Sequence, residues 1–464
     1  MNYLENIDFR KVLEVIKPTE EEKEKVRLLS NKLMDIINEI AEDNDINAEA
    51  VLVGSVAKGT WLHGKADIDV FMKFPLDIDE ASLKEYGLFL GFECAKSMQG
   101  KYELRYASHP YVTGFIEGFD IDFVPCYTIK SADKLKSAVD RTILHTEYIK
   151  KNLKEEQKNE VLLLKKFMES IHTYGAEFKV GGFSGYLCEL LIIYYGSFLG
   201  VLKAAAEEWR PNQLIDLQDY GTGDIFTEPM VVIDPTDKNR NVAAALTLQK
   251  ISEFIVASRN FLENPKEDYF FDKELYHDSN TIKYEFKQRE TKTLLIIFKP
   301  PEIPADALYP QIKKTENSMC GVLEREDFKV FNTDSWTDEE ENVIILLEIE
   351  IWQLPNIKKN PGPFIWSEVH QKRFLDKYGN KAYIEGDRWV AEIEREYKDA
   401  ESFIEDILVE NKIGLLRFGK HIKNEILKEH QIIDILDFMD SKECNEDMLL
   451  FFYEYLNKNV YLSR

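Results

Sequence analysis

Hydrophobic and polar positions follow different patterns in different stretches of the chain. Apolar residues recur at helical spacing over residues 26–43, which predicts an amphipathic helix. Short apolar runs then predict strands near residues 50–53, 66–73, 111–116 and 119–125. A helix followed by such strands is typical of an α/β module, which we expect to end near residue 150.

Beyond this module the pattern changes twice. Residues 152–204 predict helices, and residues 183–199 are apolar on most sides, so that part should be buried. Turn residues are frequent in residues 209–235, which predicts a connecting region. A further helix is predicted over residues 242–263. From about residue 270, strand-like runs alternate with helical segments, at residues 292–298, 343–352 and the amphipathic stretch 425–438.

These patterns predict three domains in a chain of 464 residues. Residues 1–150 should form the α/β domain, residues 151–270 a helical central domain, and residues 271–464 an α+β region. A hydrophobic content of 44% is ordinary for a globular protein.

The charge balance limits the choice of partner. A net charge of −25 disfavours a nucleic-acid partner, because such proteins usually carry a basic footprint. Binding to RNA therefore requires basic residues gathered on one surface. A partial candidate is residues 412–423, which contain no acid and carry Lys412, Arg417, Lys420 and Lys423. Other candidates are Lys283–Lys292, Lys313–Lys314, Lys358–Lys359 and Lys372–Arg373.

The sequence also favours one cellular compartment. It contains no uncharged apolar run of about 18 residues, so we expect no membrane span. The acidic N-terminal residues 1–6 do not resemble a signal peptide. Five widely spaced cysteines without a C-x-x-C pair indicate neither a zinc site nor a disulfide framework, so we expect a cytoplasmic location.

Candidate chemistry lies in the first domain, where acidic residues occupy predicted strands. Asp67 and Asp69 are two residues apart, so their side chains point to one face while Ile68 points to the core. A third carboxylate would come from the strand at residues 119–125. Asp120 and Asp122 have the same parity there, and periodicity alone does not choose between them.

Three carboxylates in one pocket repel one another and raise each other's pKa. Hard divalent cations relieve this repulsion, and Mg²⁺ prefers oxygen ligands and keeps positions open for phosphate. Two such ions about 4 Å apart can hold the attacking and leaving oxygens of a phosphoryl transfer. The Gly54-Ser55 turn could open a helix that binds phosphate, with the Ser55 hydroxyl and the Lys58 charge beside it.

Several long segments resemble one family. Residues 54–60 and 67–71 resemble the nucleotidyltransferase signature, and the chain as a whole resembles the archaeal, class I CCA-adding enzymes, which are tRNA nucleotidyltransferases. The segments that carry this resemblance are 122–127, 140–146, 179–191, 234–243, 308–311 and 362–364. The match at residues 122–125 favours Asp122 over Asp120. Lys58 stands where the family often has Arg, and Asp67 where it has Glu or Asp.

The resemblance implies a fold and an activity. The fold would combine a polymerase-beta-like nucleotidyltransferase domain, a helical nucleotide-recognition domain and a C-terminal tRNA-binding region. The activity would be template-independent addition and repair of the 3′-terminal CCA of tRNA from CTP and ATP, with release of pyrophosphate. The expected partners are the acceptor stem and 3′ end of tRNA. A second copy of the chain, in a homodimer, is a possible further partner. The rivals are a poly(A) polymerase, an oligoadenylate synthetase or a catalytically idle RNA-binding protein.

The resemblance also implies roles for individual residues. Asp67 and Asp69 would hold two Mg²⁺ ions, and Asp122 the ion that activates the 3′-OH. Arg240 would read the incoming base, and Asp237 would orient that arginine or share in recognition, although residues 234–237 read locally as a helix cap and turn. The residues expected to bind the nucleotide are Ser55, Lys58, His145, Lys165 and Tyr174.

Overall fold

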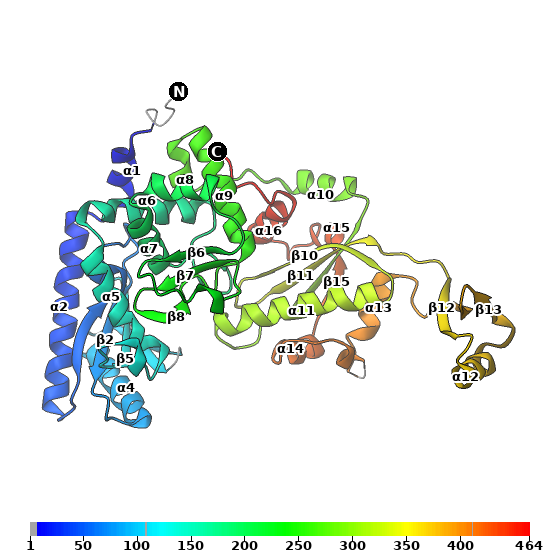
Figure 1. The fold of residues 1–464 in the computed structure, drawn as a ribbon, viewed down its shortest axis with the longest axis horizontal. Helices are drawn as coiled ribbons and strands as arrows, with labels where there is room; N and C mark the ends of the chain where they lie inside the picture. The colour runs from blue at the N-terminus through cyan, green and yellow to red at the C-terminus, as the bar shows by residue number, and fades with distance from the viewer. Residues whose placement is uncertain (1–6, 107–108, 411) are drawn as a thin grey trace. The chain divides into compact units, whose positions relative to one another are not determined.

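The computed structural model describes residues 7–106, 109–410 and 412–464, which fold into two compact units (Figure 1). The first unit extends to Glu274 and also includes Asn459–Arg464, and the second is Leu275–Lys458. The last six residues, placed by the sequence with the third region, therefore belong to the first unit. The division near residue 150 remains a prediction.

The first unit begins with a mixed five-stranded sheet whose order is β1-β2-β5-β4-β3. Strands β2 and β5 pair in parallel, and the other neighbours pair in antiparallel. The helix and four strands predicted here are present. The elements are α2 (Glu20–Asp43), β1 (Glu49–Val53), α3 (Gly54–Lys58), β2 (Ile68–Phe74), α4 (Glu80–Ser97), β3 (Lys101–Tyr106), β4 (Pro110–Ile116) and β5 (Phe119–Tyr127).

One face of this sheet is covered by α2 and α4, whose apolar side chains form a core with Ile68, Val70 and Phe123. The sequence pattern predicted neither α4 nor β3. Every side chain of β3 is exposed, so it shows no apolar alternation. In α4, two of the buried positions are Gly87 and Gly91, which reduces the apolar signal of the core-facing side.

Helices dominate the rest of the first unit. They pack around a core to which α7 contributes five buried apolar residues, as its apolar sequence predicts. They are α1 (Phe9–Ile16), α5 (Arg141–Asn152), α6 (Glu155–Ser170), α7 (Gly185–Tyr195), α8 (Phe198–Glu207) and α9 (Leu248–Glu263). The predicted connecting region instead contains two strands of a three-stranded sheet with order β6-β7-β8. The two are β6 (Gln213–Asp216) and β7 (Met230–Asp234), and β8 (Asp237–Asn241) completes the sheet just beyond the region.

The second unit is built on a four-stranded sheet with order β10-β11-β9-β15. Two apolar cores form on β9 and β11. Successive side chains of a strand point to opposite faces, so Leu294 belongs to one core and Leu295 to the other. The predicted amphipathic stretch 425–438 is interrupted by β15. The elements of this sheet and its covering helices are α10 (Ser279–Gln288), β9 (Lys292–Phe298), α11 (Ala305–Arg325), β10 (Lys329–Thr337), β11 (Val343–Ile351), α13 (Ala400–Ile407), α14 (Ile422–Lys428), β15 (Gln431–Asp434), α15 (Ile435–Phe438) and α16 (Glu446–Leu456).

A small three-stranded sheet in the second unit has the order β12-β14-β13. Its elements are β12 (Ile357–Phe364), α12 (Glu368–Tyr378), β13 (Ala382–Glu385) and β14 (Arg388–Glu394). Across the described residues, no single helix is long and apolar enough to cross a membrane, and α7 and α8 reach that limit only as a pair bent by 88°.

Candidate active site

The acidic residues of the first unit meet where β2 and β5 lie side by side. The two strands run in parallel with Asp69 opposite Asp122, and the neighbouring pair is Ile68 opposite Ile121. Both isoleucines are buried in the core, so the two aspartates point to the opposite face. Asp67 directly precedes β2 and has the same parity as Asp69. The structure therefore brings Asp67, Asp69 and Asp122 to one face of the sheet.

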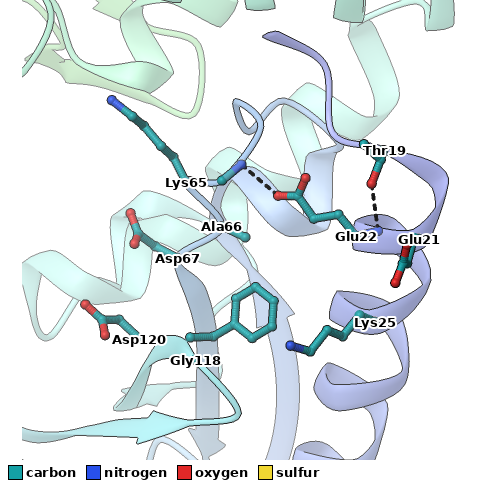
Figure 2. Close-up of a pocket in the computed structure, with 11 residues that line it drawn as sticks. Thr19, Glu21, Glu22, Lys25, Lys65, Ala66, Asp67, Gly118 and Asp120 are labelled. Atoms are coloured by element: carbon teal, nitrogen blue, oxygen red, sulfur yellow. Dashed lines mark hydrogen bonds between the residues drawn. The ribbon is translucent and has the colours of Figure 1, made fainter. Parts of the chain in front are cut away.

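Asp120, the alternative that periodicity left open, occupies a different level. Extending the register of β2 and β5 by two residues places Asp120 beside Asp67 rather than beside Asp69. Figure 2 shows the Asp67 and Asp120 side chains on neighbouring segments, pointing the same way. Both line a cavity of about 500 Å³ together with Lys25 and Lys65. Asp67, Asp69 and Asp122 together form a row of carboxylates, called the carboxylate row below. This row is open to solvent on its Asp67 side.

The charges of this row are poorly compensated. Burial, followed by the charges of Asp122 and Asp67, raises the pKa of Asp69 to about 7. Burial and the nearby charges of Asp120 and Asp122 raise the pKa of Asp67. Burial also raises the pKa of Asp122, although the Thr113 hydroxyl donates a hydrogen bond of 2.6 Å to its Oδ1. A cation is the missing partner of such a group.

The donor set fits hard divalent cations, since it consists of carboxylate oxygens at adjacent positions of two strands. In their present positions, however, no three His, Cys, Asp or Glu side chains of the described residues are arranged to hold one metal ion. Because the three aspartates share one face, rotation of their side chains could bring them to one ion without any change in the register of the strands.

The position of the Asp69 carboxylate requires a glycine at residue 54. Gly54 has a φ of +72°, in the left-handed region, and a Cβ atom there would lie 1.9 Å from Oδ2 of Asp69. A larger residue would therefore displace the carboxylate as well as strain the turn. Ser55 follows in the five-residue helix α3 and is half-buried.

Lys58, Lys165 and Tyr174 lie together near the first turn of α7. Lys58 forms an ion pair with Glu189 at 2.6 Å, and Glu189 also accepts a hydrogen bond of 2.5 Å from the Thr60 hydroxyl. Lys165 donates to the Thr60 carbonyl oxygen at 2.8 Å, and its burial lowers its pKa. A Cβ atom on Gly185 would lie 3.0 Å from the Tyr174 hydroxyl and 3.4 Å from Lys165 Nζ.

Sequence reasoning missed Glu189, the partner of Lys58 and of the Thr60 hydroxyl. Its side chain has no exposed surface. The signal was present, because Glu189 is the one charged residue of α7, whose other side chains are apolar, tyrosine or cysteine. A lone carboxylate in such a helix must be paired, since an unpaired buried charge is costly.

His145 and Arg240 meet at a second carboxylate that the sequence did not single out. Asp234 Oδ2 lies 2.8 Å from His145 Nε2 and 2.9 Å from Arg240 Nη1. Asp237, expected beside Arg240, instead accepts a hydrogen bond of 3.0 Å from Arg141 Nε. The segment read locally as a helix cap is the turn between β7 and β8.

Contacts between neighbouring side chains connect these clusters into one site. The Tyr186 ring stacks on the His145 ring with centroids 4.0 Å apart, and Lys58 Nζ lies 5.9 Å from the Tyr186 ring centroid. The charge of Lys58 in turn lowers the pKa of Asp69, although burial and like charges outweigh it. A series of neighbouring side chains, Lys58, Tyr186 and His145, therefore links the carboxylate row to Asp234 and Arg240.

The basic residues of the second unit differ in their pairing. Lys412 forms an ion pair with Asp406 and a hydrogen bond of 2.9 Å to the Tyr397 hydroxyl. Arg417 and Lys420 are exposed, in a segment whose backbone N–H groups bind side chains of α11. Those bonds run from residues 417, 419 and 421 to Ser318 Oγ, Thr315 Oγ1 and Gln311 Oε1. Other predicted basic residues in ion pairs are Lys283, Arg289, Lys292, Lys313, Lys358 and Lys359.

Comparisons with known proteins agree with this architecture. A model described as "Nucleotidyltransferase domain" matches residues 33–145, and one described as "tRNA nucleotidyltransferase, second domain" matches residues 159–271. A third, "CCA-adding enzyme, C-terminal domain", matches residues 289–434. The CCA-adding enzyme of Methanothermobacter thermautotrophicus is 49% identical over 457 residues, which cover 98% of this chain and 99% of the relative. The chain belongs to the CCA-adding enzyme family.

More distant relatives match over most of their length. The CCA-adding enzyme of Methanosarcina barkeri is 39% identical over 91% of this chain and 92% of its own. That of Methanocaldococcus jannaschii is 37% identical over 94% of this chain and 97% of its own. A solved structure of a cytoplasmic RNA terminal U-transferase covers 57% of this chain and 98% of its own, with a TM-score of 0.43 and 17% identity, too distant to bear on function. Nucleotidyltransferases use divalent metal ions, in line with the carboxylate row.

Proposed function

We propose that this protein adds and repairs the 3′-terminal CCA sequence of tRNA, using CTP and ATP and releasing pyrophosphate. The observation that carries the proposal is the pairing of Asp69 with Asp122 on neighbouring strands, in a chain 49% identical over nearly its full length to a CCA-adding enzyme. The rival poly(A) polymerase, oligoadenylate synthetase and idle RNA-binding protein are not favoured, because the matched relatives and the C-terminal family model are those of CCA-adding enzymes.

The chemistry is assigned to the carboxylate row. Asp67 and Asp69 are the proposed ligands of two Mg²⁺ ions, and Asp122 the third ligand beside Asp69. When bound, the ions polarise the α-phosphate and lower the pKa of the attacking 3′-OH. Asp69 and Asp122 hold their positions through the strand register, and Gly54 leaves room for Asp69. Positioning of this kind supplies much of the barrier reduction in phosphoryl transfer.

The nucleotide is assigned to the clusters that adjoin this row. Lys58 and Lys165 supply positive charge for the triphosphate, Ser55 a hydroxyl, and Tyr174 and His145 ring contacts and polar tips. In the structure both lysines are held at Glu189 or Thr60, so phosphate binding would share or replace these contacts. Arg240 is proposed to read the base, since its guanidinium can donate to cytosine O2 and N3 or to adenine N1.

The tRNA is assigned in part to the second unit, at Arg417, Lys420 and Lys423, where phosphate contacts would release counterions. Lys412, which sequence reasoning grouped with them, contributes less because it is already paired with Asp406. The proposal places the reaction in the cytoplasm, where the five free cysteines stay reduced. The proposal includes a homodimer as one assembly of this chain.

One assay tests the proposed function. The protein is incubated with Mg²⁺, labelled CTP or ATP, and tRNA that lacks CCA, CA or only the terminal A. We expect CMP on the first and second substrates, AMP on the third, and arrest after CCA when both nucleotides are present. Repeated AMP addition to any RNA would instead indicate a poly(A) polymerase, and no addition at all would contradict the proposal.

A further inference from the structure

The carboxylate of Asp234 is completely enclosed and has a hydrogen bond to each oxygen. It ends β7, and its side chain has no exposed surface. Its Oδ1 accepts hydrogen bonds from the Thr236 N–H at 2.9 Å, the Thr236 hydroxyl at 2.8 Å and the Tyr186 hydroxyl at 3.3 Å. Its Oδ2 accepts from His145 Nε2 at 2.8 Å and Arg240 Nη1 at 2.9 Å. No acceptor position of this carboxylate is left for a metal ion or a substrate group.

These donors come from separate elements of the first unit. His145 lies on α5, Tyr186 on α7 and Arg240 on β8. The Tyr186 and His145 rings are stacked with an interplanar angle of 17°. A buried charge is stable only when its partners stay in place, and removal of one partner is strongly unfavourable. Asp234 therefore fixes the position of all three side chains at once.

Arg240 is left with most of its donors available. A guanidinium has five N–H donors in one plane, and among the described residues Arg240 has one hydrogen bond, from Nη1 to Asp234. Its side chain is 34% exposed. The single bond to Asp234 anchors the guanidinium at Nη1 and leaves its other N–H donors available.

We propose that Asp234 is a positioning residue for base selection, which anchors the Arg240 guanidinium in place so that only bases with matching acceptors bind well. The inference rests on the proposed function, in which Arg240 reads cytosine and adenine. It reassigns the orienting role from Asp237 to Asp234. Asp237 pairs with Arg141, four residues before His145 on α5, and so fastens the turn between β7 and β8 to that helix.

The direct test is Asp234→Asn in the full chain. The amide keeps the size but removes the charge and turns an N–H₂ toward donors on one side, so Arg240 loses its anchor. We expect the preference for CTP over UTP, and for ATP over GTP, to fall by about tenfold to a hundredfold, the discrimination of one good bidentate base contact. The rate with the correct nucleotide should fall less than this preference. Measurement is by incorporation of each of the four nucleotides on tRNA lacking CCA or A.

A matched control separates this effect from loosening of the turn. Tyr220 donates a hydrogen bond of 2.8 Å from its hydroxyl to the Pro235 carbonyl oxygen, on the same turn, and among the described residues it has no hydrogen bond to Arg240. Tyr220→Phe should therefore leave the nucleotide preference unchanged. Thr236→Val removes only a hydroxyl donor to Oδ1 and should give a partial loss of preference, and it replaces Asp234→Asn if that variant does not fold.

A double-mutant comparison shows whether Asp234 acts through Arg240. Arg240→Ala and the pair Arg240→Ala with Asp234→Asn should have the same reduced preference, because the second change has nothing left to orient. A folded Asp234→Asn protein with wild-type preference, or a further loss in the double variant, overturns the inference. Failure of the wild type to add C and A would instead contradict the proposed function itself.

Discussion

Two acidic sites in the first unit balance their charge in opposite ways. At Asp67, Asp69 and Asp122, like charges lie on neighbouring strands and burial raises the pKa of all three. Burial alone would also raise the pKa of Asp234, but hydrogen bonds from His145 and Thr236 outweigh it and hold that pKa well below its usual range. The first site requires a positive charge from outside, whereas the second already has one.

This contrast separates two tasks. A site of carboxylates that lacks counter-charge can bind cations, which in turn can hold phosphate oxygens, and this suits chemistry. A site whose carboxylate is fully paired holds its partners rigid, which suits recognition. Each prediction below changes one side of the comparison and leaves the other intact.

The largest effect is expected from Asp122→Asn. The change removes the charge beside Asp69 and should reduce nucleotide addition by at least about 10²–10³-fold, the scale on which loss of one electrostatic contact acts. The fold should persist, because the amide oxygen can still accept the Thr113 hydrogen bond. Single-turnover addition of CMP and a thermal melt measure the two properties. Asp120→Asn is the control and should matter little, and near wild-type addition by Asp122→Asn would exclude it as a ligand.

A similar but smaller loss is expected from Gly54→Ala. Its Cβ atom would lie 1.9 Å from Asp69 Oδ2, so the carboxylate must move, and misplacement by about 1 Å can cost on the order of 10²-fold. Gly196→Ala is the matched control, since Gly196 has a φ of +87° and no atom within 4 Å of its added Cβ. Both variants should lose similar stability in a melt, and only Gly54→Ala should lose activity. Equal activities would show that Gly54 serves the turn alone.

Addition of Mg²⁺ sharpens the comparison through stability. In protein first treated with a chelator, Mg²⁺ at a hundredfold excess over its Kd should raise the free energy of unfolding by about 2.7 kcal/mol, and with it the melting temperature. The cation relieves repulsion at the carboxylate row, whereas Asp234 has its partners already. The Asp69→Asn variant should therefore lose the response, and Asp234→Asn should keep it. If the melting temperature of the wild-type protein does not change with Mg²⁺, the proposed metal site is contradicted.

The smallest effect concerns pH and Asp234. A carboxyl group whose pKa is lowered by folding contributes stability that is present above its unfolded pKa, about 3.9, and is lost as pH falls through the folded value. The difference in unfolding free energy between wild type and Asp234→Asn should therefore be constant near pH 7 and shrink below about pH 4. Denaturant melts across that range measure it. If the difference in unfolding free energy between the two proteins grows as the pH falls below about 4, Asp234 is not held ionised in the folded protein.

The sequence predicted the strands of the active site better than their pairing. Alternation placed Asp67 and Asp69 on one face, and the structure has them there. It could not distinguish Asp120 from Asp122, because the choice depends on the register between β2 and β5, which is set by tertiary packing. The Asp122 assignment came from family resemblance, and the role itself stays a prediction.

The buried carboxylates Glu189 and Asp234 escaped sequence reasoning for a related reason. Their partners are distant in the chain: Lys58 lies 131 residues from Glu189, and His145 lies 89 residues from Asp234. Locally, Asp234 does accept the Thr236 N–H as a capping residue would, but no helix follows. The missed elements β3 and α4 likewise lack a local apolar pattern, since one is exposed and the other has glycines at buried positions.

The most direct test of the division between chemistry and choice compares Asp122→Asn with Asp234→Asn in one assay. Single-turnover rates are measured for all four nucleotides on tRNA lacking CCA and on tRNA lacking the terminal A. We predict that Asp122→Asn lowers every rate by a similar factor and keeps the preference for C and A, whereas Asp234→Asn reduces the preference more than the rate. Two folded variants with the same profile, in rate and in preference, would contradict the account.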